Sequence, residues 1–331
     1  MSIKIFVPKS KNTKNTKNHK RIISILDNLE NCKIIVDSKK AKEAQYIVFP
    51  DIIWNIFKKG IFKNTLSQVY KQIKKSGIIP KNKDITIFVV EYVLSNYFKK
   101  IENSLDIKNA KHLIFVNLDN TTPFYNLKNS IIFRTSIIYS KKLEYEYILP
   151  IIWKRKLSNK CYTPLIASKK PKVGFCGCLY TNPYRKQICD SIDSELIEKN
   201  YILREKFCGS EINKQQRVED FYNNIRDNHF TLCPNGTGNF SIRFYQTLSC
   251  GRIPILFDTD NILPFEKEID WENLIVRVYN IKNINKKILE YYKKNDIIEK
   301  QKECYKIFQK YLTEESFPKK ISSILKYHLS N

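Results

Sequence analysis

Short apolar runs alternate with segments of helical periodicity along the first half of the chain. The runs that predict buried strands are 3–7, 33–36, 46–49, 85–90, 113–116 and 131–133. Apolar residues at helical spacing separate several of them, at 21–30, 55–75 and 92–103. Strands that alternate with helices predict α/β layers built on a parallel sheet.

The second half restarts the same alternation after a segment of poor periodicity. Strands are predicted at 173–176, 201–208, 229–233, 253–257 and 274–278, and helices at 183–198, 214–224, 241–250 and, rich in Lys, 283–329. The fold class expected is therefore α/β, with two Rossmann-like domains facing across a cleft. Residues 1–150 form the first domain, 151–171 a linker with little periodicity, 172–280 the second domain and 281–331 Lys-rich C-terminal helices.

One segment of the second domain combines a strand, a glycine-containing loop and a helix start. The loop Asn235–Asn239 holds Gly236 and Gly238, for which we expect positive φ and a close approach of a ligand to the backbone. Ser241 is a candidate N-cap of the following helix. Free N–H groups and the positive dipole end of a helix bind phosphate, so this loop is a candidate phosphate site.

The helix after this loop carries two further candidates. Arg243, one turn in, is placed to contact a second oxygen or a diphosphate, and Gly251 fits a left-handed residue that ends the helix. The sequence is neither a Walker A loop nor a GxGxxG fingerprint.

Composition points to the same segment. The 331-residue chain has 58 Lys+Arg against 33 Asp+Glu, a net charge of +25, yet 172–280 holds 13 basic and 15 acidic residues. That segment also contains six of the eight glycines and seven of the ten arginines. Where a chain otherwise uses Lys, the presence of Arg indicates that the planar guanidinium is needed, because it binds phosphate or carboxylate bidentately. The chemistry is therefore expected in 172–280, whereas the Lys elsewhere mostly solvate the surface.

Cysteine usage and apolar content bear on the compartment. The nine cysteines are an odd number for a disulfide framework, and Cys176 and Cys178 are too close for a common zinc pair. The N-terminal residues do not resemble a signal peptide, and no run approaches the roughly 18 apolar residues of a membrane span. We expect a cytoplasmic protein with reduced, mostly buried thiols.

The motifs of the second domain resemble a known family. The runs Cys233-Pro-Asn-Gly, Ser241-Ile-Arg-Phe-Tyr-Gln and Cys250-Gly-Arg-Ile-Pro-Ile, followed by Leu263-Pro-Phe and Ile269-Asp-Trp, are similar to the C-terminal signature of exostosin-like glycosyltransferases. Lys172-Val-Gly-Phe-Cys-Gly with Arg185 resembles the opening of that family's second domain. Weaker N-terminal counterparts are 44–50 and 133–136. The resemblance covers about 172–278 and is thin over 1–150.

This resemblance implies a GT-B fold, a nucleotide-sugar donor (expected to be UDP-linked), no bound metal or other cofactor, and inversion at the anomeric centre. Arg185 and Arg243 would contact the donor diphosphate, and Gly236 and Ser241 would stabilise the leaving phosphate. Many relatives have a Glu that holds the ribose at the position of Gln246, so nucleotide preference is left open. The remaining donor-binding candidates are Gly177, Asn235 and Gly251.

The implied reaction is a single displacement by an acceptor hydroxyl, with a general base from the first domain. Candidates at predicted strand ends are Asp51, Glu91 and Asp119, of which we favour Asp119 in the polar loop 117–120. The acceptor would be a glycan, polysaccharide or lipid-linked sugar. Because relatives in animals and plants are anchored by a membrane helix, its absence suggests a bacterial or viral enzyme.

The basic tract 9–20 has two interpretations: a solvated loop, or a segment that attracts an anionic acceptor or an anionic membrane surface by its charge. The pairs Lys293-Lys294 and Lys319-Lys320 would favour peripheral contact with anionic lipid in the same way.

Three other interpretations stay open. Asp258 and Asp260 form a DxD pattern after an apolar strand, as in metal-dependent GT-A glycosyltransferases. The net charge and twenty tyrosines suggest a nucleic-acid-binding protein, although 172–280 is net acidic and we expect no nucleic-acid partner. Because Gln246 stands where many relatives have a Glu, the protein could also be an inactive, lectin-like relative of these enzymes.

Overall fold

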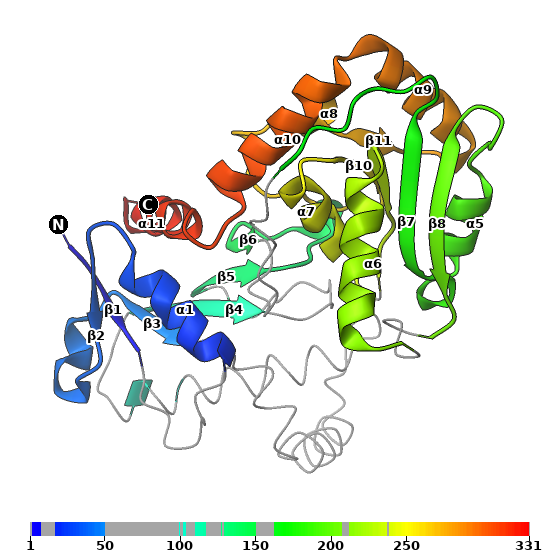
Figure 1. Cartoon of the computed structure of the whole chain (residues 1–331). Coiled ribbons are helices and arrows are strands. Elements are labelled where there is room, and N and C mark those ends of the chain that lie inside the picture. The colour runs from blue at the N-terminus through cyan, green and yellow to red at the C-terminus, as the bar shows by residue number, and fades with distance from the viewer. Residues whose placement is uncertain are drawn as a thin grey trace. The chain divides into compact units, whose positions relative to one another are not determined.

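The structure, a computed structural model, divides into two compact units (Figure 1). The first comprises Met1–Lys154 and Phe317–Asn331, and the second Arg155–Ser316. The residues that the structure describes are 2–7, 17–49, 99, 102–103, 110–116, 127, 129–149, 162–206, 212–236 and 238–330.

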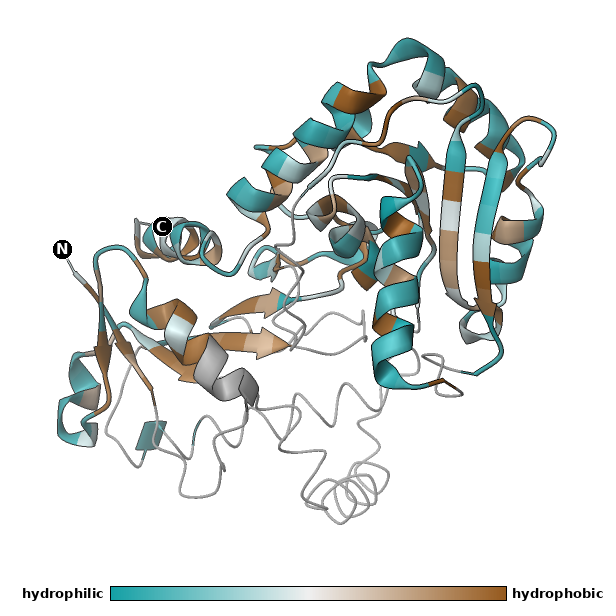
Figure 2. Ribbon diagram, viewed as in Figure 1, coloured by the Kyte–Doolittle hydropathy of each residue, from teal (hydrophilic) through white to brown (hydrophobic). Residues whose placement is uncertain are grey.

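The first unit is built on a parallel six-stranded sheet. Its strand order is β2-β1-β3-β4-β5-β6, and every pairing is parallel. The strands are β1 (Ile3–Phe6), β2 (Cys32–Ile35), β3 (Tyr46–Phe49), β4 (Lys111–Val116), β5 (Ser130–Arg134) and β6 (Glu146–Ile148). Runs that are apolar on both faces, such as β4 and β5, form central strands because both of their faces are covered. Figure 2 shows these two strands as largely hydrophobic.

Two helices from opposite ends of the sequence complete the core of this unit. Helix α1 (Lys17–Asp27) contributes Ile22, Ile25 and Leu26, and helix α11 (Phe317–Ser330) contributes Ile321 and Leu325 to the same buried cluster. Side chains tie α11 to the sheet: the hydroxyl of Tyr46 donates to the carbonyl of Leu325 at 2.9 Å, and Lys111 Nζ to that of His328 at 2.6 Å. Residues 317–330 are therefore part of the first unit, although 162 residues of the second unit separate them from it in sequence.

The second unit has a parallel five-stranded sheet of order β11-β10-β9-β7-β8. Its strands are β7 (Lys172–Cys178), β8 (Glu198–Arg204), β9 (Phe230–Cys233), β10 (Ile253–Phe257) and β11 (Val276–Val278). The chain runs outward from β7 to β8 and then returns to the other side of β7 to form β9. The carboxyl ends of β7 and β9 thus flank the topological switch point, where open α/β sheets bind ligands.

The helices of the second unit connect and cover these strands. They are α5 (Tyr184–Asp190), α6 (Lys214–Arg226), α7 (Ile242–Ser249), α8 (Trp271–Leu274), α9 (Ile284–Lys294) and α10 (Ile297–Tyr311). Short 3₁₀ turns are η1 (Ser38–Glu43) and η2 (Tyr139–Lys141) in the first unit and η3 (Leu179–Thr181) and η5 (Ile281–Asn283) in the second. Asp296 begins α10 as an N-cap whose side chain accepts from the backbone N–H of Ile298 and Glu299.

An extended segment before β7 is held to the second unit by side chains. Gln301, fully buried, accepts from the N–H of Leu165 and donates to its carbonyl, at 2.9 and 2.8 Å. The hydroxyl of Tyr292 makes the same pair of bonds with Ser168, at 2.8 and 2.9 Å. Arg252 and His229 donate to the carbonyls of Thr163 and Ile166. Side chains here satisfy backbone groups that a neighbouring strand would otherwise bind.

The expected fold class, α/β with two parallel-sheet domains, is confirmed, and the predicted strands 46–49 and 253–257 have the observed bounds. The predicted helix 183–198 was too long, because α5 ends at Asp190. The hydroxyl of the C-cap Ser191 donates to the carbonyl of Ile188, and the side chain of Asp193 accepts from the N–H of Glu195 in a turn. The predicted helix 21–30 begins earlier, so the last residues of the basic tract 9–20 are helical rather than loop. Elements predicted at 55–75 and 85–90 lie outside the described residues, as does most of 92–103.

His229 is a buried histidine whose two ring nitrogens are both used. The N–H of Lys172 can only donate, so Nδ1 accepts it at 3.0 Å, and Nε2 therefore carries the proton that is donated to the carbonyl of Ile166 at 3.0 Å. Burial, helped by Lys172 and Arg252, lowers the pKa of His229 against the opposing effect of the Ile166 carbonyl. Protonation of Nδ1 would break the bond to the first residue of β7.

We predict that His229 makes the stability of the protein depend on pH. The unfolded imidazole binds a proton near pH 6.5 and the folded one only at lower pH, so its contribution is complete above about pH 6.5 and is lost as the pH falls toward the folded pKa. His229→Gln keeps an acceptor and a donor but does not titrate. Urea unfolding between about pH 5 and 8 should therefore show a smaller pH dependence in the variant, by at most about 1.4 kcal/mol per pH unit. Equal slopes for the two proteins would contradict the assignment.

Candidate functional site

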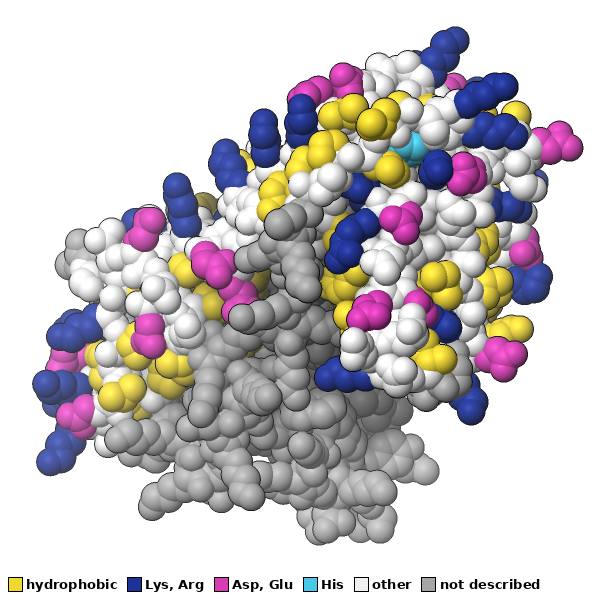
Figure 3. All heavy atoms as spheres, in the orientation of Figure 1, with side chains coloured by type: hydrophobic (Ala, Val, Ile, Leu, Met, Phe, Trp, Pro, Cys, Tyr) yellow, Lys and Arg dark blue, Asp and Glu magenta, His cyan; other side chains and the backbone are white. Residues whose placement is uncertain are grey.

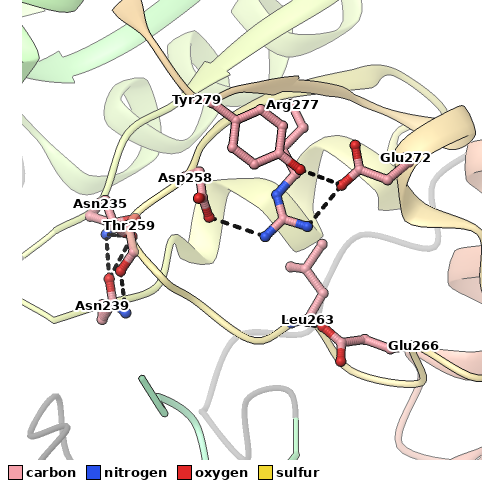
Figure 4. Close-up of polar contacts among 9 residues, drawn as sticks. All are labelled: Asn235, Asn239, Asp258, Thr259, Leu263, Glu266, Glu272, Arg277 and Tyr279. Atoms are coloured by element: carbon pink, nitrogen blue, oxygen red, sulfur yellow. Dashed lines mark hydrogen bonds and ion pairs between the residues drawn. The ribbon is translucent and has the colours of Figure 1, made fainter. Parts of the chain in front are cut away.

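Polar side chains from three neighbouring strand ends meet at the switch point of the second unit. Asn235, two residues after β9, donates from Nδ2 to Asn239 Oδ1 at 2.9 Å and to Thr259 Oγ1 at 2.8 Å. Thr259, which follows β10, donates to Asn239 Oδ1 at 2.5 Å and accepts from Asn239 Nδ2 through its carbonyl at 3.1 Å. Figure 4 shows these three side chains together. They close the loop after β9 and fix it to the end of β10.

Residues after β7 hold the other side of this loop. Arg185 donates from Nε to the carbonyl of Asn235 at 3.0 Å and from Nη1 to that of Cys178 at 3.1 Å. Asn182 Nδ2 lies 3.4 Å from the carbonyl of Gly236. Arg185 is only half-buried, so its guanidinium combines fixed main-chain contacts with access to solvent at the loop. The structure therefore brings together Arg185, Asn235 and Gly236, three of the donor-binding candidates, and their binding of a donor stays a prediction.

Ser241 is the N-cap of α7, as predicted. Its φ and ψ of −126° and 115° are extended, and its side chain makes no capping hydrogen bond with any residue that the structure describes. The N–H groups of the first turn thus lack a side-chain acceptor from this cap, the arrangement in which helix N-termini bind anions. The positive φ expected for the loop glycines is not found at Gly236.

Arg243 lies in the core rather than at the surface of the loop. It is 9% exposed and donates from Nη2 to the carbonyl of Cys176 in β7 at 2.6 Å and from Nη1 to that of Leu232 in β9 at 3.3 Å. Its Cζ lies 4.3 Å from the ring centroid of Phe175. Burial lowers the pKa of Arg243 and raises the pKa of the neighbouring Cys189 thiol to about 11 and of the Cys233 thiol to about 12. This geometry favours a role in joining β7 to β9, and a contact with a diphosphate stays a prediction.

Two glycines are required by close approaches. A Cβ at Gly177 would lie 2.7 Å from Arg243 Nη2, so the guanidinium reaches Cys176 only because this residue has no side chain. Gly251 has a φ of 61°, confirming the predicted left-handed end of α7, and its Cβ would lie 2.2 Å from the ring of Tyr162. Both positions are explained by packing, and their proposed part in donor binding stays untested.

Gln246 is buried inside α7. It is 2% exposed, and its Nε2 lies 3.3 Å from the hydroxyl of Tyr222 in α6. A ribose contact through this amide stays a prediction that the observed burial does not itself support.

The two aspartates of the DxD pattern, Asp258 and Asp260, lie in different surroundings. Asp258 Oδ1 accepts from Arg277 Nη2 at 3.1 Å, and Arg277 Nη1 donates to Glu272 at 2.9 Å (Figure 4). Asp260 is exposed, with a φ of 57°. Within the described part of the chain, no group of three or more His, Cys, Asp or Glu side chains could hold a metal ion.

An open pocket of about 500 Å³ lies beside this ion-pair network. Its lining includes Arg277, Glu272 and Trp271. The Nε1 of Trp271 donates to the carbonyl of Pro264 at 2.8 Å. The pocket thus combines a guanidinium with carboxylates next to the end of β10.

The sequence missed Asn182, Thr259 and the Arg277–Glu272 pair. Thr259 lies two residues after the predicted strand 253–257, so the rule that ligands bind at the carboxyl ends of parallel strands was a signal for it. Asn182 lies six residues after the predicted strand 173–176, and no local pattern marked it. The general-base candidates Asp51, Glu91 and Asp119 lie outside the described residues.

Comparison with known proteins identifies the segment that carries this site. Residues 173–292, roughly a third of the 331-residue chain, match the family model of the Exostosin GT47 domain. The predicted resemblance to exostosin-like proteins is thereby confirmed for this segment. Exostosin-1 of Drosophila melanogaster is 32% identical over 74 residues, which cover 22% of this chain. The match spans only 10% of the length of that protein.

Several solved structures show distant similarity. A GtfA/B complex aligns with a TM-score of 0.43 and 13% identity over 76% of this chain and 63% of that one. A glycosyltransferase from Rickettsia africae aligns with a TM-score of 0.40 and 11% identity over 100% of this chain and 99% of that one. An α1,3-fucosyltransferase aligns with a TM-score of 0.38 and 12% identity over 95% of this chain and 92% of that one. In the described residues no helix is long and apolar enough to cross a membrane.

We predict that Gly177→Ala destabilises the second unit. The added methyl group would displace the Arg243 guanidinium from the carbonyl of Cys176, at a cost of about 1–3 kcal/mol. Gly236→Ala is the matched control, because its Cβ would have its nearest neighbour at 3.9 Å. Urea denaturation of both variants checks this. Wild-type stability of Gly177→Ala would show that the guanidinium does not need this space.

Proposed function

We propose that this protein is a GT-B-type glycosyltransferase whose second unit binds a nucleotide-sugar donor at the switch point. The observation that carries this proposal is the coincidence of two independent findings. The residues that match the Exostosin GT47 domain, 173–292, contain the loop cluster at the carboxyl ends of β7, β9 and β10. That cluster is where an open parallel sheet places its ligand.

The chemistry of the cluster suits a diphosphate attached to a sugar. Arg185 supplies a guanidinium at the loop, and the start of α7 at Ser241 supplies oriented N–H groups, which stabilise negative charge on a leaving phosphate. Among the described residues, the buried Asn235 Oδ1 has no hydrogen-bond partner, so it is a candidate acceptor for a donor hydroxyl.

The finer assignment is a transfer with inversion from a UDP-linked sugar to a glycan, polysaccharide or lipid-linked acceptor. The acceptor oxygen would attack the anomeric carbon as the bond to the nucleoside diphosphate breaks. A carboxylate would take the proton of the acceptor hydroxyl, and Asp119 remains the proposed base. The ion pair between Asp258 and Arg277 supports a metal-independent reaction, because this carboxylate already has a cationic partner.

We predict that Arg185→Ala abolishes the thermal stabilisation given by a donor. A ligand at about 100 times its Kd stabilises the native state by about 2.7 kcal/mol, which a thermal-shift screen of UDP- and GDP-linked sugars detects. Loss of the guanidinium should also lower turnover by about a hundredfold. Lys186→Ala is the control, since this neighbouring side chain is 62% exposed and forms a surface ion pair with Asp190 of the same helix. Arg243→Ala is less informative because that side chain is buried in the core. Unchanged donor binding by Arg185→Ala would remove the proposed site.

We predict that turnover with the donor found in that screen survives chelation by EDTA. The carboxylate of Asp258 is already neutralised by Arg277, so it is not expected to bind a divalent ion. Activity that is lost in EDTA and restored by Mn²⁺ would contradict this and favour Asp258 and Asp260 as ligands.

A further inference from the structure

The outer surface of helices α9 and α10 carries a concentration of lysines, most of them unpaired. On α10, Lys302, Lys306 and Lys310 are spaced four residues apart and therefore lie along one line of the helix. Figure 3 shows a row of basic side chains following α10, with others over α9. The exposed lysines of η5 and α9 are Lys282, Lys286, Lys287, Lys293 and Lys294.

Most of this charge is not neutralised within the protein. Lys302 pairs with Glu299, and Lys286 lies 4.0 Å from Glu290. The others form no ion pair with any residue in the described part of the chain; they are Lys282, Lys287, Lys293, Lys294, Lys306 and Lys310. Six ammonium groups, one on η5 and five on α9 and α10, thus lack an ion-pair partner among the described residues.

The opposite faces of these helices are already used. Ile284 and Ile288 of α9 and Ile297, Cys304 and Phe308 of α10 are buried in the core of the second unit. The helices therefore cannot turn an apolar face toward a bilayer. Their outer surface is charged, with exposed Asp296, Glu299 and Glu303 beside the more numerous lysines. No large hydrophobic side chain is exposed between 281 and 316 in the structure, which also leaves this surface without an aromatic platform for stacked bases.

We propose that this surface, Lys282 to Lys310 of η5, α9 and α10, adsorbs electrostatically to a membrane rich in anionic lipid. Unpaired lysines at the surface of a folded unit are attracted by the potential of anionic headgroups, and each contributes separately. Because nothing apolar inserts, the contact is reversible and sensitive to salt. The surface lies outside the loop cluster at β7, β9 and β10, so the proposal is independent of the proposed catalytic function.

The test measures co-sedimentation of the full-length protein with vesicles of phosphatidylcholine alone or with about a third phosphatidylglycerol. We expect binding to the anionic vesicles only, lost when the salt is raised to about 1 M. Lys302→Glu, Lys306→Glu and Lys310→Glu together should lower the partition coefficient about tenfold or more.

A matched control separates this surface from net charge. Lys39, Lys40 and Lys42 are exposed on η1 of the first unit, and their replacement by Glu changes the total charge equally. The proposal requires the control triple variant to bind the vesicles nearly as well as the wild type. Equal losses in both variants would overturn it, as would binding to phosphatidylcholine alone. Retention on DNA without vesicle binding would also overturn it, and would assign the surface to nucleic acid. Thermal unfolding of each variant verifies that it is folded.

Discussion

The guanidinium of Arg243 is the interaction on which the geometry of the second unit depends. It joins the carbonyls of Cys176 and Leu232, which belong to strands β7 and β9 on the two sides of the switch point. A switch point is where the pairing of parallel strands changes direction and the two loops diverge. A buried charge at this place is tolerated because carbonyl dipoles and the face of Phe175 replace water around it.

The loops that diverge from this point are held by amide and hydroxyl side chains and by one guanidinium, and by no carboxylate among the contacts described here. Asn235, Asn239 and Thr259 bind one another, and Arg185 and Asn182 bind main-chain carbonyls of the same loop. Such a network fixes the backbone of the loop through polar groups that are not carboxylates. The carboxylates of this edge, Asp258 and Glu272, are instead engaged by Arg277.

Strands and most helices could be predicted from the sequence because buried parallel strands read as short apolar runs between turns. The candidate loop and its helix were found by the same local pattern. What could not be predicted depends on contacts distant in sequence. Arg243 looks like a surface ligand in the sequence, but Gly177, 66 positions earlier, makes the space that buries it. Likewise α11 was grouped with the Lys-rich tail, yet its apolar face packs on a sheet formed by the first 150 residues.

The position of α11 has a consequence for how the chain folds during synthesis. The second unit, Arg155–Ser316, is continuous in sequence and contains every strand of its own sheet. The core of the first unit stays open on one side until Phe317, Ile321 and Leu325 have left the ribosome. Domains generally fold in the order of synthesis, and contacts between distant residues form late. Here the order is reversed: the unit made second can finish first, and the unit made first must wait, with apolar surface exposed, for a helix encoded some 290 residues after α1.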